Sequence, residues 1–209
     1  MLTVVTPPAE EPISLEQAKA HLRVEIADDD ALIAALVTAA RLHCEKELRQ
    51  ALVTTGFRYT LDGFPTGYGH GYTGYGHGYT GAEPEWPAGQ SLARIELPRP
   101  PLIAVSSVAY VDPQGATVTL DPSAYEVEAG TPGRLYPAYG TSWPAARRKV
   151  AAVTIAYTAG YGAAAAVPEV AKAAIKVALG HLYEHRDDDA PIPDAVDLLL
   201  AALDHGSYA

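Results

Sequence analysis

The chain has 209 residues and a formal net charge of −10, with 48% apolar and 19% charged residues. This length and composition predict a globular protein with a hydrophobic core and exclude a largely disordered chain. An acidic chain is poorly suited to wrapping nucleic acid, because such binding depends on Lys and Arg at the phosphates. This charge is still compatible with a negatively charged protein surface along which DNA moves without being bound. The single cysteine, Cys44, excludes an internal disulfide bond and a cysteine-based zinc site.

No apolar run reaches the roughly 18 residues of a membrane-spanning helix. The first five residues, Met-Leu-Thr-Val-Val, lack the basic start and the long apolar stretch of a signal peptide. We therefore expect a soluble cytosolic protein that makes no membrane contact.

Two helices are predicted in the first 50 residues. Ser14 and Gln17 have the spacing of a capping box, and apolar residues recur at helical spacing over 14–25. The acidic run at 28–30 can cap a second helix that reaches about Gln50. As an alternative, this run could bind a cation. One broad apolar stripe marks the second helix, and Arg41, Glu45, Lys46 and Arg49 lie off it.

The middle of the chain is rich in Thr, Tyr and Val and predicts short strands in series. The first two, at 53–62 and 91–97, could pair as a long hairpin. The others are expected at 102–111, 117–120, 125–128, 134–136 and 150–158. Tight turns join several of these strands, which favours an antiparallel sheet or a small sandwich.

A tandem repeat lies between the first two strands. The heptapeptide Gly-Tyr-Gly-His-Gly-Tyr-Thr occupies 67–73 and again 74–80. Its glycines carry a large entropy cost on ordering, so we predict a flexible surface loop over 65–90. His70 and His77 could bind a metal, and the tyrosines could stack on nucleic acid or touch a neighbouring subunit. These tyrosines are Tyr68, Tyr72, Tyr75 and Tyr79.

Arg147, Arg148 and Lys149 form the one basic cluster. They could simply flank an exposed strand. They could also form salt bridges with an acidic surface of a partner.

Two helices are expected at the end of the chain. Pro168 is suited to a first helical position, and the apolar pattern runs to about Arg186. Asp194 is suited to capping a last helix that ends near Leu203. Together the segments predict an α+β fold. Its helical portion is 1–50 with 163–209, its β-rich portion is 51–162, and we expect both in one composite domain.

His181, Glu184 and His185 match the H-x-x-E-H pattern of a zinc protease, in which the glutamate serves as base. A catalytic zinc needs a third ligand, which in that family lies far downstream, and only 24 residues follow His185. We also find no nucleophile elbow, Walker A motif or dinucleotide fingerprint. The sequence therefore predicts no enzyme and no cofactor, with a metal-dependent hydrolase or a binding module displaying the Tyr/His loop as alternatives.

The order of these segments resembles a known family. The helix pair opens with Ile-Ser-Leu-Glu-Gln-Ala-Lys at 13–19, and Leu-Pro-Arg-Pro-Pro-Leu at 97–102 leads into the next strand. The strand at 153–162 ends in Tyr-Thr-Ala-Gly-Tyr-Gly, and the helix that follows ends in Leu-Tyr-Glu-His-Arg. Apart from the repeat, nearly the whole chain is similar to the head–tail connector (adaptor) proteins of long-tailed phages and gene transfer agents.

The resemblance implies a structural role in a particle neck, after assembly in the bacterial cytoplasm. Such adaptors form a ring, commonly of twelve copies, beneath the portal protein. The ring extends the DNA channel without sequence-specific binding and docks the stopper or another tail component. In related connectors the C-terminal segment reaches the portal, which here implies Asp194–Ala209, with Leu198, Leu199, Leu203 and Tyr208 as contact candidates. The basic cluster and the repeat tyrosines are candidates for contacts with neighbouring subunits or the stopper.

Overall fold

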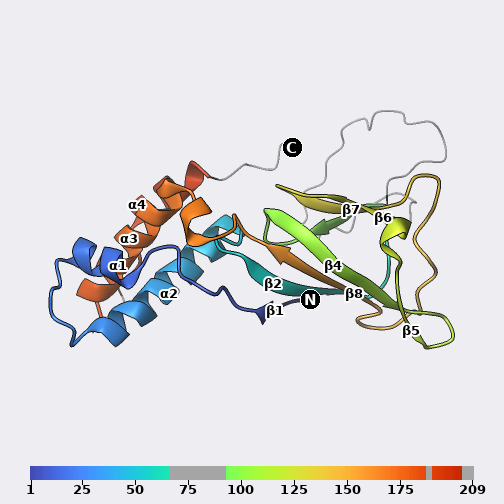
Figure 1. The fold of residues 1–209 in the computed structure, drawn as a ribbon, viewed down its shortest axis with the longest axis horizontal. Helices are drawn as coiled ribbons and strands as arrows, with labels where there is room; N and C mark the ends of the chain where they lie inside the picture. The colour runs from blue at the N-terminus through green and yellow to red at the C-terminus, as the bar shows by residue number, and fades with distance from the viewer. Residues whose placement is uncertain (66–92, 187–189, 204–209) are drawn as a thin grey trace.

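The computed structural model describes residues 1–65, 93–186 and 190–203. A helical portion lies at one end of the molecule and a β sandwich at the other (Figure 1). The chain begins with one strand of the sandwich, forms two helices, returns to the strands and ends in two further helices, so both of its terminal thirds contribute to the helical portion. This arrangement confirms the predicted α+β fold class. The predicted boundaries of the two portions, and their union in one composite domain, stay a prediction.

The four helices form close to where the apolar patterns predict them. They are α1 (Leu15–Leu22), α2 (Asp30–Leu48), α3 (Glu169–Glu184) and α4 (Asp194–Ala201). At the start of α1 the Gln17 backbone N–H donates to the Ser14 hydroxyl and the Ser14 N–H donates to the Gln17 side chain. The predicted capping box is therefore confirmed. None of the helices in the described ranges is long and apolar enough to cross a bilayer.

Three helix starts differ from the predictions. Asp29 is the N-cap of α2, but its side chain makes no capping hydrogen bond. The prolines at 168 and 193 are the N-caps of α3 and α4, so Pro168 precedes the first turn and Asp194 opens its helix instead of capping it. A proline fits there because its fixed φ and its missing N–H suit a helix entry.

The strands form two antiparallel sheets. The larger sheet has the order β1–β2–β8–β4–β5, and the smaller has the order β3–β7–β6. The bounds of the larger sheet are Leu2–Thr6, Thr55–Leu61, Val153–Ala159, Leu102–Val111 and Thr117–Thr119, in that order. Those of the smaller sheet are Ile95–Leu97, Gly133–Pro137 and Tyr125–Glu128. The central strand β8 alternates buried and half-buried residues, which is the period expected when one sheet face is covered.

The predicted hairpin between the first two strands is wrong. β2 pairs with β1 and β8, whereas β3 pairs with β7 in the other sheet. The connection that contains the repeat therefore crosses between sheets. The edge strand β1 was not predicted, because five residues with no alternating pattern give little signal for a strand.

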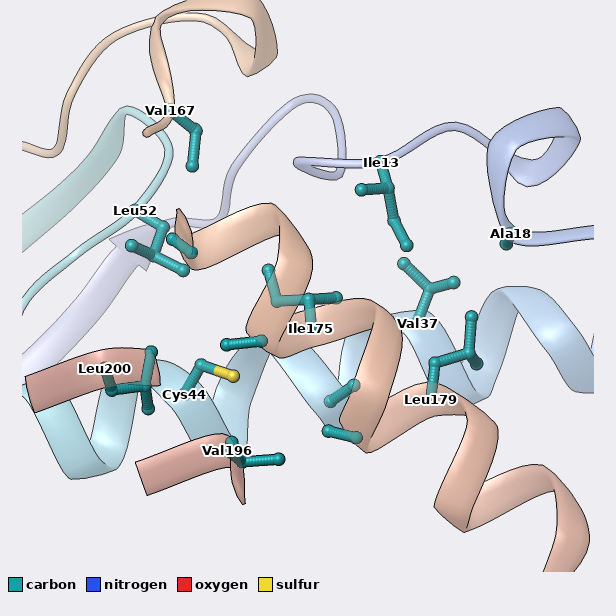
Figure 2. Packing of buried hydrophobic residues seen from close by; sticks show 14 of the residues in the cluster. Ile13, Ala18, Val37, Cys44, Leu52, Val167, Ile175, Leu179, Val196 and Leu200 are labelled. Carbon is teal, nitrogen blue, oxygen red and sulfur yellow. The ribbon is translucent and has the colours of Figure 1, made fainter. Parts of the chain in front are cut away.

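Two hydrophobic cores correspond to the two portions. The helical core gathers Ile33, Val37, Ile175 and Leu179 among others, and the sandwich core gathers Phe57, Val108, Leu135 and Ile155 among others. Figure 2 shows Cys44 of α2 beside Val196 and Leu200 of α4. The short helix α4 is thus held to the bundle by its own buried side chains.

Candidate functional site

The C-terminal helix α4 has one face in the core and one face in solvent. Val196 is 0% exposed and Leu200 is 3% exposed, whereas Leu198 is 77% exposed. Leu199 and Leu203 are half-buried and pack against the helical core. Of the predicted contact candidates on this helix, Leu198 is the one that presents a large apolar side chain to solvent. Tyr208 lies outside the described residues.

A buried glutamine holds the end of α4 in place. Gln50 is 4% exposed, and its Nε2 donates to the carbonyl of Leu203 across 3.5 Å. The Tyr161 hydroxyl donates to Gln50 Oε1 at 2.8 Å. Tyr161 follows β8, so the chain leaves α4 at a point fixed by the junction between helices and sheet.

The Tyr161→Phe change tests this tether. The change leaves Gln50 Oε1 without its partner in a buried place, which costs about 1–3 kcal/mol. We expect the free energy of unfolding to fall by about 1–2 kcal/mol. The change should also accelerate amide exchange in α4 relative to the wild type, while exchange in α2 stays at the wild-type rate. An unchanged exchange rate in α4 would show that the Gln50 contact does not hold the helix.

The predicted basic cluster is exposed at the far end of the sandwich. Arg147, Arg148 and Lys149 are all solvent-exposed, and the next residue, Val150, is 80% exposed. The Arg147 N–H donates to the carbonyl of Val111, which fixes the backbone at this point. None of the three makes an ion pair with the described part of the chain. The cluster is therefore open to an acidic partner, although its role stays a prediction. The repeat residues Tyr68, Tyr72, Tyr75 and Tyr79 and both repeat histidines, His70 and His77, lie outside the described residues.

The H-x-x-E-H pattern brings two imidazoles together at the end of α3. The rings of His181 and His185 lie 4.4 Å apart between centroids, as i, i+4 spacing on a helix requires. His181 Nε2 lies 3.1 Å from the carbonyl of Ala190. Among the described residues no group of three His, Cys, Asp or Glu side chains could hold a metal ion. The contact with Ala190 instead links α3 to the segment that precedes α4.

The acidic run before α2 is engaged in structural contacts. The Tyr183 hydroxyl donates to Asp29 at 2.6 Å, and Lys19 forms an ion pair with Asp30 at 2.6 Å. These bonds join α1, α2 and α3. The contacts favour the structural interpretation of the run over the cation site.

Arg41 is buried, contrary to its predicted place off the apolar stripe. Its side chain is 7% exposed and forms ion pairs with Glu11 and with Glu45, each at 2.7 Å. Burial lowers the pKa of Arg41, but the hydrogen bond to Glu11 and the charge of Glu45 outweigh it, so the pKa is raised. Glu45 also accepts a bond from the Leu52 N–H at 3.0 Å, and its backbone carbonyl accepts one from Arg99. We call Glu11, Arg41 and Glu45 the arginine clasp.

Cys44 is a buried structural residue. It is 0% exposed, and burial raises the pKa of its thiol to about 12. A thiol with this pKa is not ionised near neutral pH and is a poor nucleophile. Cys44 is therefore no candidate for catalysis.

Comparison with known proteins adds to these observations. Residues 12–68 match the family described as phage gp6-like head–tail connector protein. No curated protein matches the chain.

The solved structures that contain a chain of similar fold include three of gene transfer agent particles. A chain in the virion of a native gene transfer agent particle is 22% identical, with a TM-score of 0.72, over 97% of this chain and 94% of that chain. A chain in the neck of an empty particle, solved with C6 symmetry, is 23% identical with the same TM-score and the same coverage. A chain in the neck of a native particle, solved with C12 symmetry, is 22% identical with a TM-score of 0.68, over 97% of this chain and 93% of that chain. At this level of identity the likeness shows a shared fold. The resemblance to head–tail connector proteins is thereby confirmed in sequence over residues 12–68, and the fold is shared over nearly the whole chain with chains of gene transfer agent particles.

Proposed function

We propose that this protein is a structural subunit of a particle neck, a head–tail connector that joins a DNA-filled head to a tail. The observation that carries the proposal is the fold that 97% of this chain shares with chains of gene transfer agent necks. The connector match over residues 12–68 supports it independently. The particle is a phage or a gene transfer agent, assembled in the bacterial cytoplasm.

The subunit acts as one copy in a ring, of twelve copies in the simplest case, beneath the portal protein. Two of the matched neck structures were solved with sixfold and twelvefold symmetry, which supports repeated equivalent copies. DNA passes through the ring without sequence-specific contacts. A net charge of −10 suits a channel that guides phosphates and does not hold them. The role needs no cofactor and no catalysis.

The segment from Asp194 onward makes the portal contact. Leu198 supplies the exposed apolar group. Leu199 and Leu203 pack against the helical core and so hold this segment in place. Tyr208 extends the same segment. At the other end of the molecule the basic cluster docks the stopper or another neck component.

Changing Leu198 to Asp tests the portal contact more sharply than removing α4 would. Removal would expose the helical core, because Val196 and Leu200 are buried. Leu198 is 77% exposed, so Leu198→Asp leaves the unfolding midpoint unchanged. Loss of one buried leucine, about 1.5–3 kcal/mol, should weaken portal binding by about 10–100-fold. Light scattering of the purified chain with purified portal measures this binding.

Ile26→Asp is the matched control. Ile26 is also a large apolar residue of the helical portion, and it is 61% exposed. Portal binding should keep its wild-type strength in this variant. If the wild-type chain never associates with the portal, the connector function is wrong. If Leu198→Asp binds as the wild type does, the assignment of α4 is wrong.

A further inference from the structure

Helix α2 is apolar on the side that faces away from the core. Ile33, Val37, Ala40 and Cys44 are buried in the helical core. The opposite side is exposed and carries only aliphatic side chains over its first three turns. These residues, which we call the outward face of α2, are Ala31, Leu32, Ala35, Ala39 and Leu42.

The outward face has the spacing of a helix-packing seam. Its members at 32, 35, 39 and 42 are separated by three, four and three residues, which places them in one line along the helix. Leu32 is 39% exposed and Leu42 is 55% exposed. The alanines between them leave room for another backbone to approach closely. A helix that is apolar all round is normally buried on all sides.

No charged side chain interrupts the outward face. The charged residues between Asp30 and Lys46 are Arg41 and Glu45, and both are bound in the arginine clasp. α2 runs along the lower edge of the helical portion in Figure 1, with α1, α3 and α4 above it. Nothing in the described residues covers the outward face.

We infer that the outward face of α2 packs against a second copy of this chain, as one side of the contact between neighbours in the ring. The inference rests on the proposed function. Two copies that each carry a charge of −10 repel one another, and a charge-free face is where they can approach at least cost. The same lack of cations disfavours an anionic partner. In a cyclic ring the contact is heterologous, so the outward face meets a different surface of the neighbour.

A photo-crosslinking amino acid at position 42 tests this inference. Light and heavy isotope-labelled chains are mixed, irradiated and separated, alone at high concentration and again with purified portal. We expect crosslinked dimers of one light and one heavy chain, at a yield about tenfold above that from the same amino acid at position 103. Ile103 is a fitting control because it is an exposed apolar residue of the sandwich, at 43% exposure.

Crosslinks from position 42 to the portal, or a yield equal to the control in both mixtures, would overturn the inference. The Leu42→Glu variant supplies a second measurement. It should keep the wild-type unfolding midpoint and lose the association of copies by about tenfold, since it places a carboxylate in an apolar seam. If Leu42→Glu still forms portal-bound rings of wild-type mass, the inference fails while the connector function stands. If wild-type copies crosslink but never bind the portal, the connector function fails while the contact stands.

Discussion

Replacing Arg41 with Ala is expected to lower the free energy of unfolding by about 3–5 kcal/mol. The change removes the cation of a buried ion-pair cluster and leaves the carboxylates of Glu11 and Glu45 without it. Glu45 then lacks the Nη1–Oε2 bond of 2.7 Å, and Glu11 lacks the Nε–Oε2 bond of 2.7 Å. The clasp joins the segment before α1 to α2 and, through the Leu52 N–H, to the start of the sandwich. Breaking it loosens the junction as well as one helix.

Urea unfolding followed by far-UV circular dichroism measures this loss. Lys46→Ala is the control, because it removes an ion pair with Glu47 at 3.4 Å in which the side chains of Lys46 and Glu47 are 76% and 39% exposed. Exposed pairs of this kind contribute about 0.2–1 kcal/mol. Equal losses in the two variants would show that the buried clasp contributes no more than a surface pair. An Arg41→Met variant should recover part of the lost stability, because it restores the packing of the arginine stem, although the carboxylates of Glu11 and Glu45 still lack their cation.

Replacing Gly160 with Ala is expected to destabilise the fold by roughly 4 kcal/mol, the sum of two effects. Gly160 ends β8 at φ +127°, a conformation that costs an L residue about 1–3 kcal/mol. An added Cβ would also lie 2.5 Å from the carbonyl oxygen of Val53. Val53 is buried backbone at the junction and cannot move aside cheaply, so overpacking adds about 1–3 kcal/mol.

Gly130→Ala separates these two effects. Gly130 has φ +113°, and an added Cβ there would meet nothing within 4 Å. Its loss of stability in urea should be about 1–3 kcal/mol, the conformational part alone. Gly160→Ala losing no more than Gly130→Ala would contradict the close approach of Val53.

Local patterns in the sequence predict the elements of this fold well. The capping box at Ser14 and Gln17 is sequence-local, and so is the apolar spacing of α2 and α3. β4 forms over the predicted range, because Val and Leu there are followed by a turn that ends the strand. The fold class follows from the order of these elements.

Contacts between distant segments could not be predicted from the same patterns. From the sequence alone, Arg41 is expected to be solvated. Its burial depends on the ion pair with Glu11, which lies thirty positions away in the chain. Gln50 and Tyr161 are 111 positions apart, and neither belongs to a recognisable motif. The hairpin prediction failed for the same reason, since strand partners are chosen by which faces are buried together and not by proximity in sequence. Among the predicted contact residues that the structure describes, Leu198 and the basic cluster are the solvent-exposed ones. The sequence alone could not show which candidates are exposed.

The crossing from β2 to β3 bears on how this protein can vary in evolution. In a hairpin, a change in connection length shifts the pairing of two strands. Here β2 and β3 belong to different sheets and do not pair. The number of residues between Leu61 and Ile95 therefore does not set the register of any strand pair. Tandem copies such as those at 67–73 and 74–80 are prone to gain or lose a unit when their coding sequence is replicated. We therefore expect close relatives of this protein to differ by whole seven-residue units at this place, while every strand pairing described above is retained.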